Sequence, residues 1–228
     1  MHEFPTTRLS LVLAAARKAD AKSEEALAEL CRIYWHPLYT FVRRSGYGHE
    51  EAQDLTQSFI ARMLEKDVLS EFQQVRGRFR SFLLASLKNF LANERDAERR
   101  LKRGGGGERL PISQIEPADD STPERIFEKQ WALALVNRVL SQLQEECERE
   151  GKGERFETLR GCLTGDDAHL PYRQIARQLE TSEGAVKVAI HRLRRRFHEA
   201  LREEISMTLT EGGEISEEIR YLLAALQN

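Results

Sequence analysis

The chain has few of the residues on which disulfide scaffolds, metal-binding folds and membrane spans depend. Its three cysteines, Cys31, Cys147 and Cys162, are odd in number and far apart, with no Cys-x-x-Cys motif and no histidine pair at zinc spacing. We interpret them as reduced thiols of a cytoplasmic protein and expect neither a metal nor a cofactor. No apolar run reaches the roughly eighteen residues of a membrane helix, so we expect no membrane association.

Aromatic residues and prolines are also scarce. Aromatics make up 7% of the chain and prolines number six, whereas 32% of the residues are charged. This composition favours helices over a β-sandwich, and no segment has a convincing strand pattern, so we predict an all-α fold. The apolar stretch 9–16 is short and leads into Arg17 and Lys18, which predicts a first helix capped by Thr7 instead of a signal peptide.

The net charge of −2 hides a segregated charge distribution. Residues 76–109 contain ten Lys or Arg and four Asp or Glu, a net charge of +6, and residues 185–202 contain six and one, a net charge of +5. The other segments are acidic, with net charges of −2 over 1–75, −6 over 110–184 and −5 over 203–228. Two positive blocks separated by acid predict two contacts with DNA.

Residues 171–197 have the pattern of a short helix, a polar turn and a longer basic helix. Ile175, Ala176 and Leu179 define the first helix, and Ser182 can cap the second. The second helix has a packing side (Val186, Ala189, Ile190, Leu193, Phe197) and an opposite side (Gly184, Val188, His191, Arg192, Arg195). This combination predicts a helix-turn-helix that reads duplex DNA, the alternative being a helical hairpin with a solvated charged face.

Four consecutive glycines at 104–107 divide the chain into two helical parts. We predict a first domain over 1–103, a flexible linker over 104–121, a second domain over 122–205 and an acidic helical extension over 206–228. Three apolar stripes at helical spacing support these parts. They are Phe79, Phe82, Leu83, Leu87, Phe90 and Leu91; Phe127, Trp131, Leu135, Val139, Leu143 and Cys147, after a cap at Thr122; and Ile215, Ile219, Leu222, Leu223 and Leu226.

Three motifs carry a resemblance to a known family. Residues 54–57, Asp-Leu-Thr-Gln, are similar to the Asp-Leu-x-Gln of region two in extracytoplasmic-function sigma factors, the smallest class of bacterial RNA polymerase specificity subunit. Residues 79–89 resemble the Phe-Arg-x-Trp-Leu-x-x-x-x-x-Asn helix of the same region. Residues 172–196 resemble region four, with Glu-Gly-Ala-Val-Lys at 183–187 near the usual Gly-Thr-Val-Lys. The resemblance covers most of the chain up to residue 205.

The resemblance implies that the chain directs core RNA polymerase to promoters. The first domain would bind the β′ clamp and open the minus-ten element, and the second would bind the β flap and read the minus-thirty-five element. The candidate DNA contacts of region four are Lys187, Val188, His191, Arg192 and Arg195. Lysine and arginine can donate hydrogen bonds to guanine edges, and an exposed valine can pack on a thymine methyl group.

In region two the resemblance implies both DNA and polymerase contacts. The candidate DNA contacts are Arg78, Arg80, Lys88, Asn89 and Arg95. Asn89 matches a family asparagine near a splayed base, and the four cations can hold phosphates. The loop 72–78 is predicted to form a pocket for an unstacked base, although Phe72 can equally be a core residue. The candidate polymerase contacts are Asp54, Gln57, Ser58 and Glu65.

The polymerase-binding helix departs from the family pattern. Residues 51–58 read Glu-Ala-Gln-Asp-Leu-Thr-Gln-Ser where the family has Asp-Ala-Glu-Asp-Leu-x-Gln-Glu, so Gln53 and Ser58 are neutral. We hypothesise that a Ser/Thr kinase phosphorylates Thr56, or failing that Ser58, and that the added charge of about −1.5 to −2 restores docking to a basic clamp surface. This hypothesis takes Thr56 to lie at the edge of the apolar stripe with its hydroxyl available. In the alternative, Thr56 is a tolerated boundary residue, and Asp54 with Glu50, Glu51 and Glu65 suffices for docking. An anti-sigma factor is the other candidate regulator.

Two other classes of function share single features with this sequence. A helix-turn-helix repressor or activator would share the second domain, but it should dimerise on a palindrome and leaves the first domain unexplained. An enzyme is not expected, because Cys162 and His169 are the only nearby nucleophile and base and no third group orients them. The acidic C-terminal helix can fold back on the reader, recruit a partner or cap the second domain, and we predict the last of these.

Overall fold

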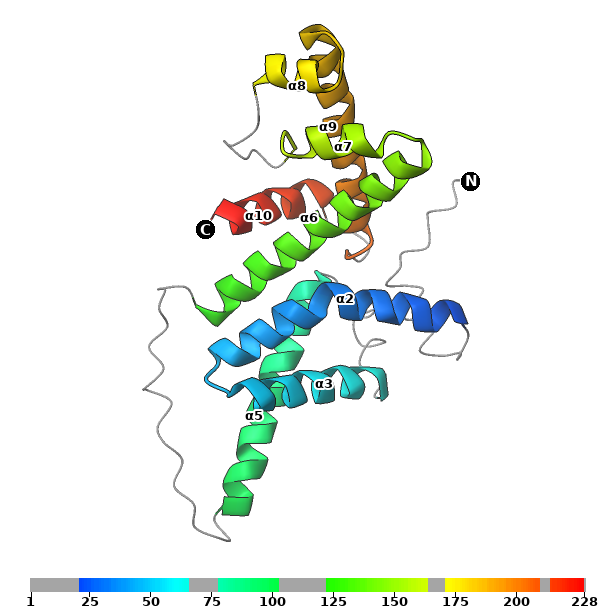
Figure 1. The fold of residues 1–228 in the computed structure, drawn as a ribbon. Helices are drawn as coiled ribbons and strands as arrows, with labels where there is room; N and C mark the ends of the chain where they lie inside the picture. Colours follow the sequence, from blue (N-terminus) through cyan, green and yellow to red (C-terminus); the bar gives the residue numbers. More distant parts are fainter. Residues whose placement is uncertain (1–20, 66–77, 103–121, 164–170, 210–213, 228) are drawn as a thin grey trace. The chain divides into compact units, whose positions relative to one another are not determined.

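The structure is a computed structural model that describes residues 21–65, 78–102, 122–163, 171–209 and 214–227. Over these residues the fold is all-α, which confirms the predicted class (Figure 1). The described helices are α2 (Ala21–Arg44), α3 (His49–Glu65), α5 (Phe79–Lys102), α6 (Pro123–Arg149), α7 (Gly153–Arg160), α8 (Tyr172–Gln178), α9 (Glu183–Ser206) and α10 (Ile215–Gln227). The β-type pairing found within the described part is one antiparallel bridge between Arg78 and Leu209.

Several predicted features fall outside the described residues. They are the first helix over 9–16, the linker over 104–121 and the loop 72–78 apart from Arg78. These stay predictions.

The chain divides into two compact units. The first combines residues 1–133 with 205–228, and the second comprises residues 134–204. Helices α6 and α9 therefore contribute to both units, and α10 belongs to the first. Helix α10 is thus grouped with residues 1–133 and not with 134–204. Its predicted role as an end cap of the second domain, 122–205, and the predicted domain boundaries stay predictions.

The core of the first unit forms where α2 packs on α3 and α3 packs on α5. Figure 1 shows α2 and α3 as neighbours joined by a short turn. The buried apolar side chains of this unit include Tyr34, Leu38, Phe41, Val42, Phe59, Met63, Phe79, Leu83, Leu87, Phe90, Leu91, Phe127, Trp131 and Leu222. Aromatic rings meet edge to face, with centroids 5.4 Å apart for Tyr34 and Phe79 and 6.5 Å apart for Phe41 and Phe127, an arrangement that adds to their burial.

Helix α6 confirms its predicted start and its predicted apolar stripe. The Thr122 Oγ1 accepts a hydrogen bond of 3.3 Å from the backbone N–H of Arg125, which satisfies one of the unpaired donors of the first turn. All six predicted stripe residues, from Phe127 to Cys147, are buried. A stripe at helical spacing can be read from local sequence because every member belongs to the same helix.

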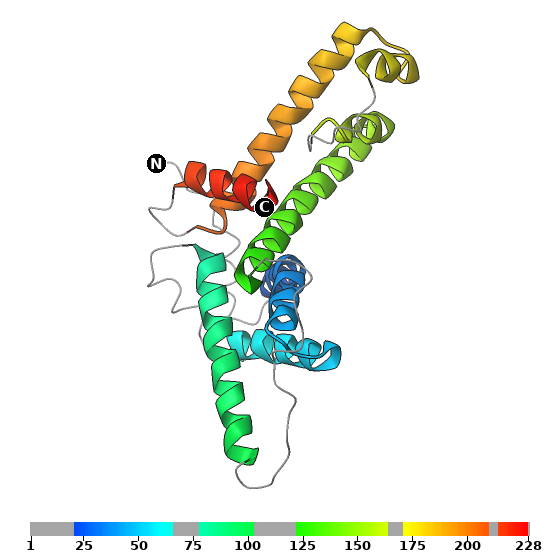
Figure 2. The same ribbon diagram turned by 90° about the vertical axis from the view of Figure 1, so that its left-hand side faces the viewer.

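In the second unit, α6 and α9 run antiparallel (Figure 2). An ion pair of 3.0 Å joins Arg138 to Glu204, and another of 2.8 Å joins Glu146 to Arg196. The core between these helices, α7 and α8 consists of Leu135, Val139, Leu143, Cys147, Phe156, Leu159, Cys162, Ile175, Ala176, Val186, Ile190, Leu193 and Leu201. This packing turns one side of α9 inward and leaves the other side open.

Helix α10 packs differently from its predicted stripe. Leu222 is fully buried, but Leu223 is 50% exposed, so its place in the stripe was wrong. Glu218 is buried instead, with an exposed fraction of 1%. A carboxylate at a buried position requires a charged partner, which the sequence pattern did not reveal.

Candidate nucleic-acid interface

Helices α8 and α9 form the predicted helix-turn-helix. The turn is closed by hydrogen bonds from the N–H of Leu179 to the carbonyl of Ile175 at 3.0 Å and from the N–H of Thr181 to the carbonyl of Ala176 at 2.9 Å. Glu180 takes a left-handed conformation with φ +49°, which ends α8 abruptly. The predicted cap of α9 is confirmed, because Ser182 Oγ accepts a hydrogen bond of 3.2 Å from the Ala185 N–H.

The outer face of α9 presents the predicted reading residues to solvent. Lys187, Val188, His191, Arg192 and Arg195 are all exposed, and the exposed fraction of Val188 is 51%. Within the described part of the chain, Lys187, His191 and Arg192 form no hydrogen bond or ion pair, and Arg195 has only a long contact of 3.7 Å with Glu199. The face therefore offers donors and an apolar contact that are free for a ligand.

The remaining arginines of the basic run have structural partners. Arg194 donates two hydrogen bonds, of 2.9 and 3.2 Å, to the carbonyl of Cys162 in the turn after α7. Arg196 pairs with Glu146 at 2.8 Å and with Glu150 at 3.2 Å, and the hydrogen bond that it donates to Glu146 raises the pKa of Arg196. Helical periodicity thus separates two arginines that hold the unit together from two that face solvent.

Sequence reasoning missed further cations beside this face. Arg173 and Arg177 are exposed on α8, the helix that crosses the DNA backbone in this motif. Arg155 of α7 is also exposed and lines a groove together with Val188 and Arg192. The spacing of Arg173 and Arg177 opposite the buried Ile175 and Ala176 was a usable signal, because i and i+4 share one face of a helix.

The cations at the start of α5, in the first unit, have a different environment. Arg80 has an exposed fraction of 3% and donates from Nε and Nη2 to the two carboxylate oxygens of Glu218, at 2.6 and 3.3 Å. Its guanidinium also lies 3.8 Å from the ring centroid of Tyr221 and 5.0 Å from that of Trp131. In this arrangement Arg80 is not an exposed phosphate contact, which corrects the sequence-based expectation.

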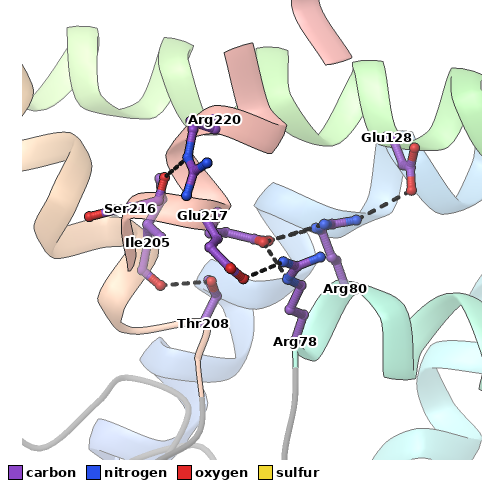
Figure 3. A network of polar contacts seen from close by, with 9 residues as sticks. Arg78, Arg80, Glu128, Ile205, Thr208, Ser216, Glu217 and Arg220 are labelled. Atoms are coloured by element: carbon purple, nitrogen blue, oxygen red, sulfur yellow. Dashed lines mark hydrogen bonds and ion pairs between the residues drawn. The ribbon is translucent and has the colours of Figure 1, made fainter. Parts of the chain in front are cut away.

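Arg78 binds the same acidic helix (Figure 3). Its Nε lies 2.7 Å from Glu218 Oε2, and its Nη2 lies 3.5 Å from Glu217. Burial by itself lowers the pKa of Arg80, but the hydrogen bond and charge of Glu218 outweigh it, and the pKa is raised. The Arg80 guanidinium therefore remains charged, and the Glu218 carboxylate neutralises it within the protein.

Of the other candidates on α5, Lys88 and Arg95 have partners within the protein, and Asn89 has none among the described residues. Lys88 pairs with Glu124 at 2.6 Å, and this hydrogen bond lowers the pKa of the Glu124 carboxyl. Arg95 donates to the Tyr47 hydroxyl at 2.9 Å and to the Ser45 carbonyl at 3.1 Å. Asn89 is exposed and makes no hydrogen bond with another described residue, so it is the one candidate on this helix left open within the described part.

On α3, three candidate polymerase contacts, Asp54, Gln57 and Ser58, are exposed, whereas the side chain of Glu65 lies outside the described residues. Thr56 has no exposed surface, and its Oγ1 donates a hydrogen bond of 2.6 Å to the carbonyl of Ala52. The expectation that the Thr56 hydroxyl is available is wrong in this conformation. A helical threonine can bond to the carbonyl four residues earlier, and here burial encloses that bond.

Comparison with known proteins agrees with the geometry of the second unit. Residues 167–197 match the model of the family Sigma-70, region 4. The matched segment contains α8 and residues 183–197 of α9, with the exposed side chains described above. No curated protein and no solved structure matches the chain.

The described residues also bear on membrane and metal binding. None of the described helices is long and apolar enough to span a bilayer. Within the same residues, no group of three or more His, Cys, Asp or Glu side chains is placed to hold a metal ion.

Proposed function

We propose that the chain is an RNA polymerase sigma factor of the extracytoplasmic-function type that directs promoter recognition and transcription initiation. The observation that carries this proposal is the match to region four over a helix-turn-helix whose Lys187, His191 and Arg192 face solvent without partners in the described part. A reading helix needs such uncommitted donors, because base-edge hydrogen bonds supply the discrimination between sequences.

In this proposal the second domain reads the minus-thirty-five element as duplex DNA. Lys187 and Arg192 donate to base edges, and Val188 supplies an apolar contact. Arg173 and Arg177 of α8 bind backbone phosphates, which position the reader without specifying sequence. The β flap of core polymerase is the proposed protein partner of this domain.

The first domain is proposed to contact the β′ clamp through α3 and the minus-ten element through α5. Support comes from the exposed Asp54, Gln57 and Ser58 on α3 and from the exposed Asn89 on α5. The acidic first turn of α3, with Glu50 and Glu51, adds negative charge suited to a basic clamp surface.

Transcription with purified core RNA polymerase and a promoter library tests the proposal. The full chain should make core enzyme initiate at new sites, and Arg192→Ala should reduce that initiation, whereas Arg160→Ala should not. Arg160 is a matched control because it is an exposed arginine of the same unit that pairs with Glu157 at 3.1 Å. A chain that binds promoter DNA but never redirects core polymerase would be a repressor or activator instead.

Phosphorylation remains a separate hypothesis within this proposal. A kinase reaches Thr56 only if α3 opens, because the hydroxyl is buried, whereas Ser58 is exposed on the same helix. Pull-down of core polymerase should be stronger with Ser58→Glu than with Ser58→Ala, since the added charge restores the acid of the family pattern. Equal pull-down by the two variants would remove the kinase and leave an anti-sigma factor as the proposed regulator.

A further inference from the structure

Two arginines, Arg78 just before α5 and Arg80 in its first turn, converge on one carboxylate of α10. Glu218 is 1% exposed, and its two oxygens receive the Arg80 Nε at 2.6 Å and the Arg78 Nε at 2.7 Å. Glu217 adds a second, more exposed carboxylate 3.5 Å from Arg78, and Glu128 of α6 lies 3.3 Å from Arg80 (Figure 3). Paired guanidinium groups of this kind bind any oxyanion with two acceptor oxygens, including a phosphodiester.

Helix α10 combines these polar contacts with little fully buried apolar surface. Leu222 is its one fully buried apolar side chain, while Leu223 is half exposed and Ile215, Ile219 and Leu226 are only partly buried. Elements with little buried apolar surface open locally at low free-energy cost. A buried ion pair contributes little net stability beyond the cost of desolvating its charges. The docked helix is therefore suited to release when another anion competes.

Residues Thr208 and Leu209, which precede α10 in the chain, bind the backbone at the start of α5. The Phe79 N–H donates to the Thr208 carbonyl at 3.2 Å, and Arg78 and Leu209 form an antiparallel bridge. Release of α10 thus leaves its start tethered beside the two arginines. A tethered competitor acts at a high effective concentration, so it can hold back a ligand that binds the same groups.

We propose that α10 is an intramolecular acidic competitor that covers Arg78 and Arg80, so that α10 and single-stranded promoter DNA occupy these arginines in alternation. The carboxylates of Glu217 and Glu218 stand where backbone phosphates bind when the helix is displaced. This inference rests on the proposed function, because it takes the start of α5 to be a DNA contact.

The test measures binding of the full-length chain to a fluorescein-labelled single strand of about 20 nucleotides and mixed sequence, by fluorescence anisotropy. Glu218→Gln should tighten binding about tenfold, because two charged donors become available to phosphates. Glu214→Gln is the matched control, since it removes the same charge from an exposed residue next to α10 and should change affinity less than about twofold.

A second substitution tests whether the tighter DNA binding of Glu218→Gln depends on Arg78. Arg78→Ala should reverse most of the gain in the Glu218→Gln background but have little effect in the unmodified chain, where α10 already occupies Arg78. Equal losses in both backgrounds would show that Arg78 is not masked and would overturn the proposal. Glu217→Gln, which changes a side chain that is 54% exposed and so preserves the fold, should give a smaller gain in the same direction.

Hydrogen exchange of the α10 backbone amides tests directly whether the helix is released. Exchange should become faster in Glu218→Gln, and also in the unmodified chain when the oligonucleotide is added, because coupling between the two ligands is reciprocal. Faster exchange without tighter DNA binding would overturn the proposed competition. Unchanged exchange in both Glu217→Gln and Glu218→Gln would overturn it as well. Neither result affects the transcription assay, so failure of this inference is distinguishable from failure of the proposed function.

Discussion

Helices α5 and α9 both carry dense positive charge, and the protein uses the two sets of cations differently. On α9, Lys187 and Arg192 face solvent and form no polar contact with other described residues. On α5, Arg80 is buried against Glu218, and Lys88 is paired with Glu124. A positive block in a sequence is therefore not equivalent to positive charge available for DNA.

The difference arises from where the acids lie. The acids that neutralise α5 come from α10 and from the start of α6, which belong to the same compact unit. The acids beside α9 come from Glu146 and Glu150 of α6 and reach only the inward-facing Arg196. Among the described residues, the outward face of α9 forms no ion pair except the one between Arg195 and Glu199, so its charge stays available.

The largest effect is expected from breaking the buried ion pair between Arg80 of α5 and Glu218 of α10. Arg80→Ala should lower the free energy of unfolding by up to about 3 kcal/mol, because Glu218 loses the hydrogen bonds from Arg80 and keeps only Arg78 as an ion-pair partner among the described residues. Urea unfolding followed by tryptophan fluorescence measures this in the first unit, where Trp35 and Trp131 lie. The α9 counterpart Arg192→Ala should change stability by less than about 0.5 kcal/mol, and equal losses would contradict the comparison.

The next effect concerns binding instead of stability. Arg192→Ala should weaken binding to a selected duplex promoter by about 1–3 kcal/mol, because a base-edge contact is lost while the fold stays intact. Electrophoretic mobility shift at fixed salt measures the change. Arg78→Ala should leave the same duplex affinity unaltered, and a comparable loss with both variants would show that exposure does not distinguish the two helices.

A smaller effect is expected within α9 itself. Arg196→Ala should cost less than about 1 kcal/mol of stability, because its ion pairs with Glu146 and Glu150 are partly exposed to solvent. Thermal unfolding monitored by circular dichroism measures it. Arg195→Ala is the matched control on the opposite side of the helix and should have no measurable effect on stability, although it should weaken DNA binding.

The smallest effect is the pH dependence of the pair between Lys88 and Glu124. The pKa of Glu124 is lowered in the folded protein, chiefly by the hydrogen bond from Lys88, so the pair stabilises at neutral pH and loses this contribution as the pH falls through the folded pKa. Both side chains are more than a third exposed, so solvent screening limits the contribution to a few tenths of a kcal/mol.

Glu124→Gln measures this contribution. The variant should be slightly less stable than the parent chain at pH 7, and the two unfolding curves should converge in acid. A difference that grows on acidification would contradict the assigned direction.

Much of the candidate site could be predicted because it depends on one helix at a time. The caps at Thr122 and Ser182 and the exposed face of α9 follow from spacing within a few turns, and the structure confirms them. The burial of Thr56 was missed, because a position at the edge of an apolar stripe can be exposed or enclosed depending on what packs beside it.

By itself the sequence determined the helical class, the helix-turn-helix and the two positive blocks, since these depend on composition and on periodicity over neighbouring residues. Only the tertiary structure decided which of those cations stay free. Arg80 and Glu218 are 138 positions apart along the chain, and no local pattern links them. Their pairing arises because folding places α10 against α5, and a buried charge is tolerated only where an opposite charge meets it.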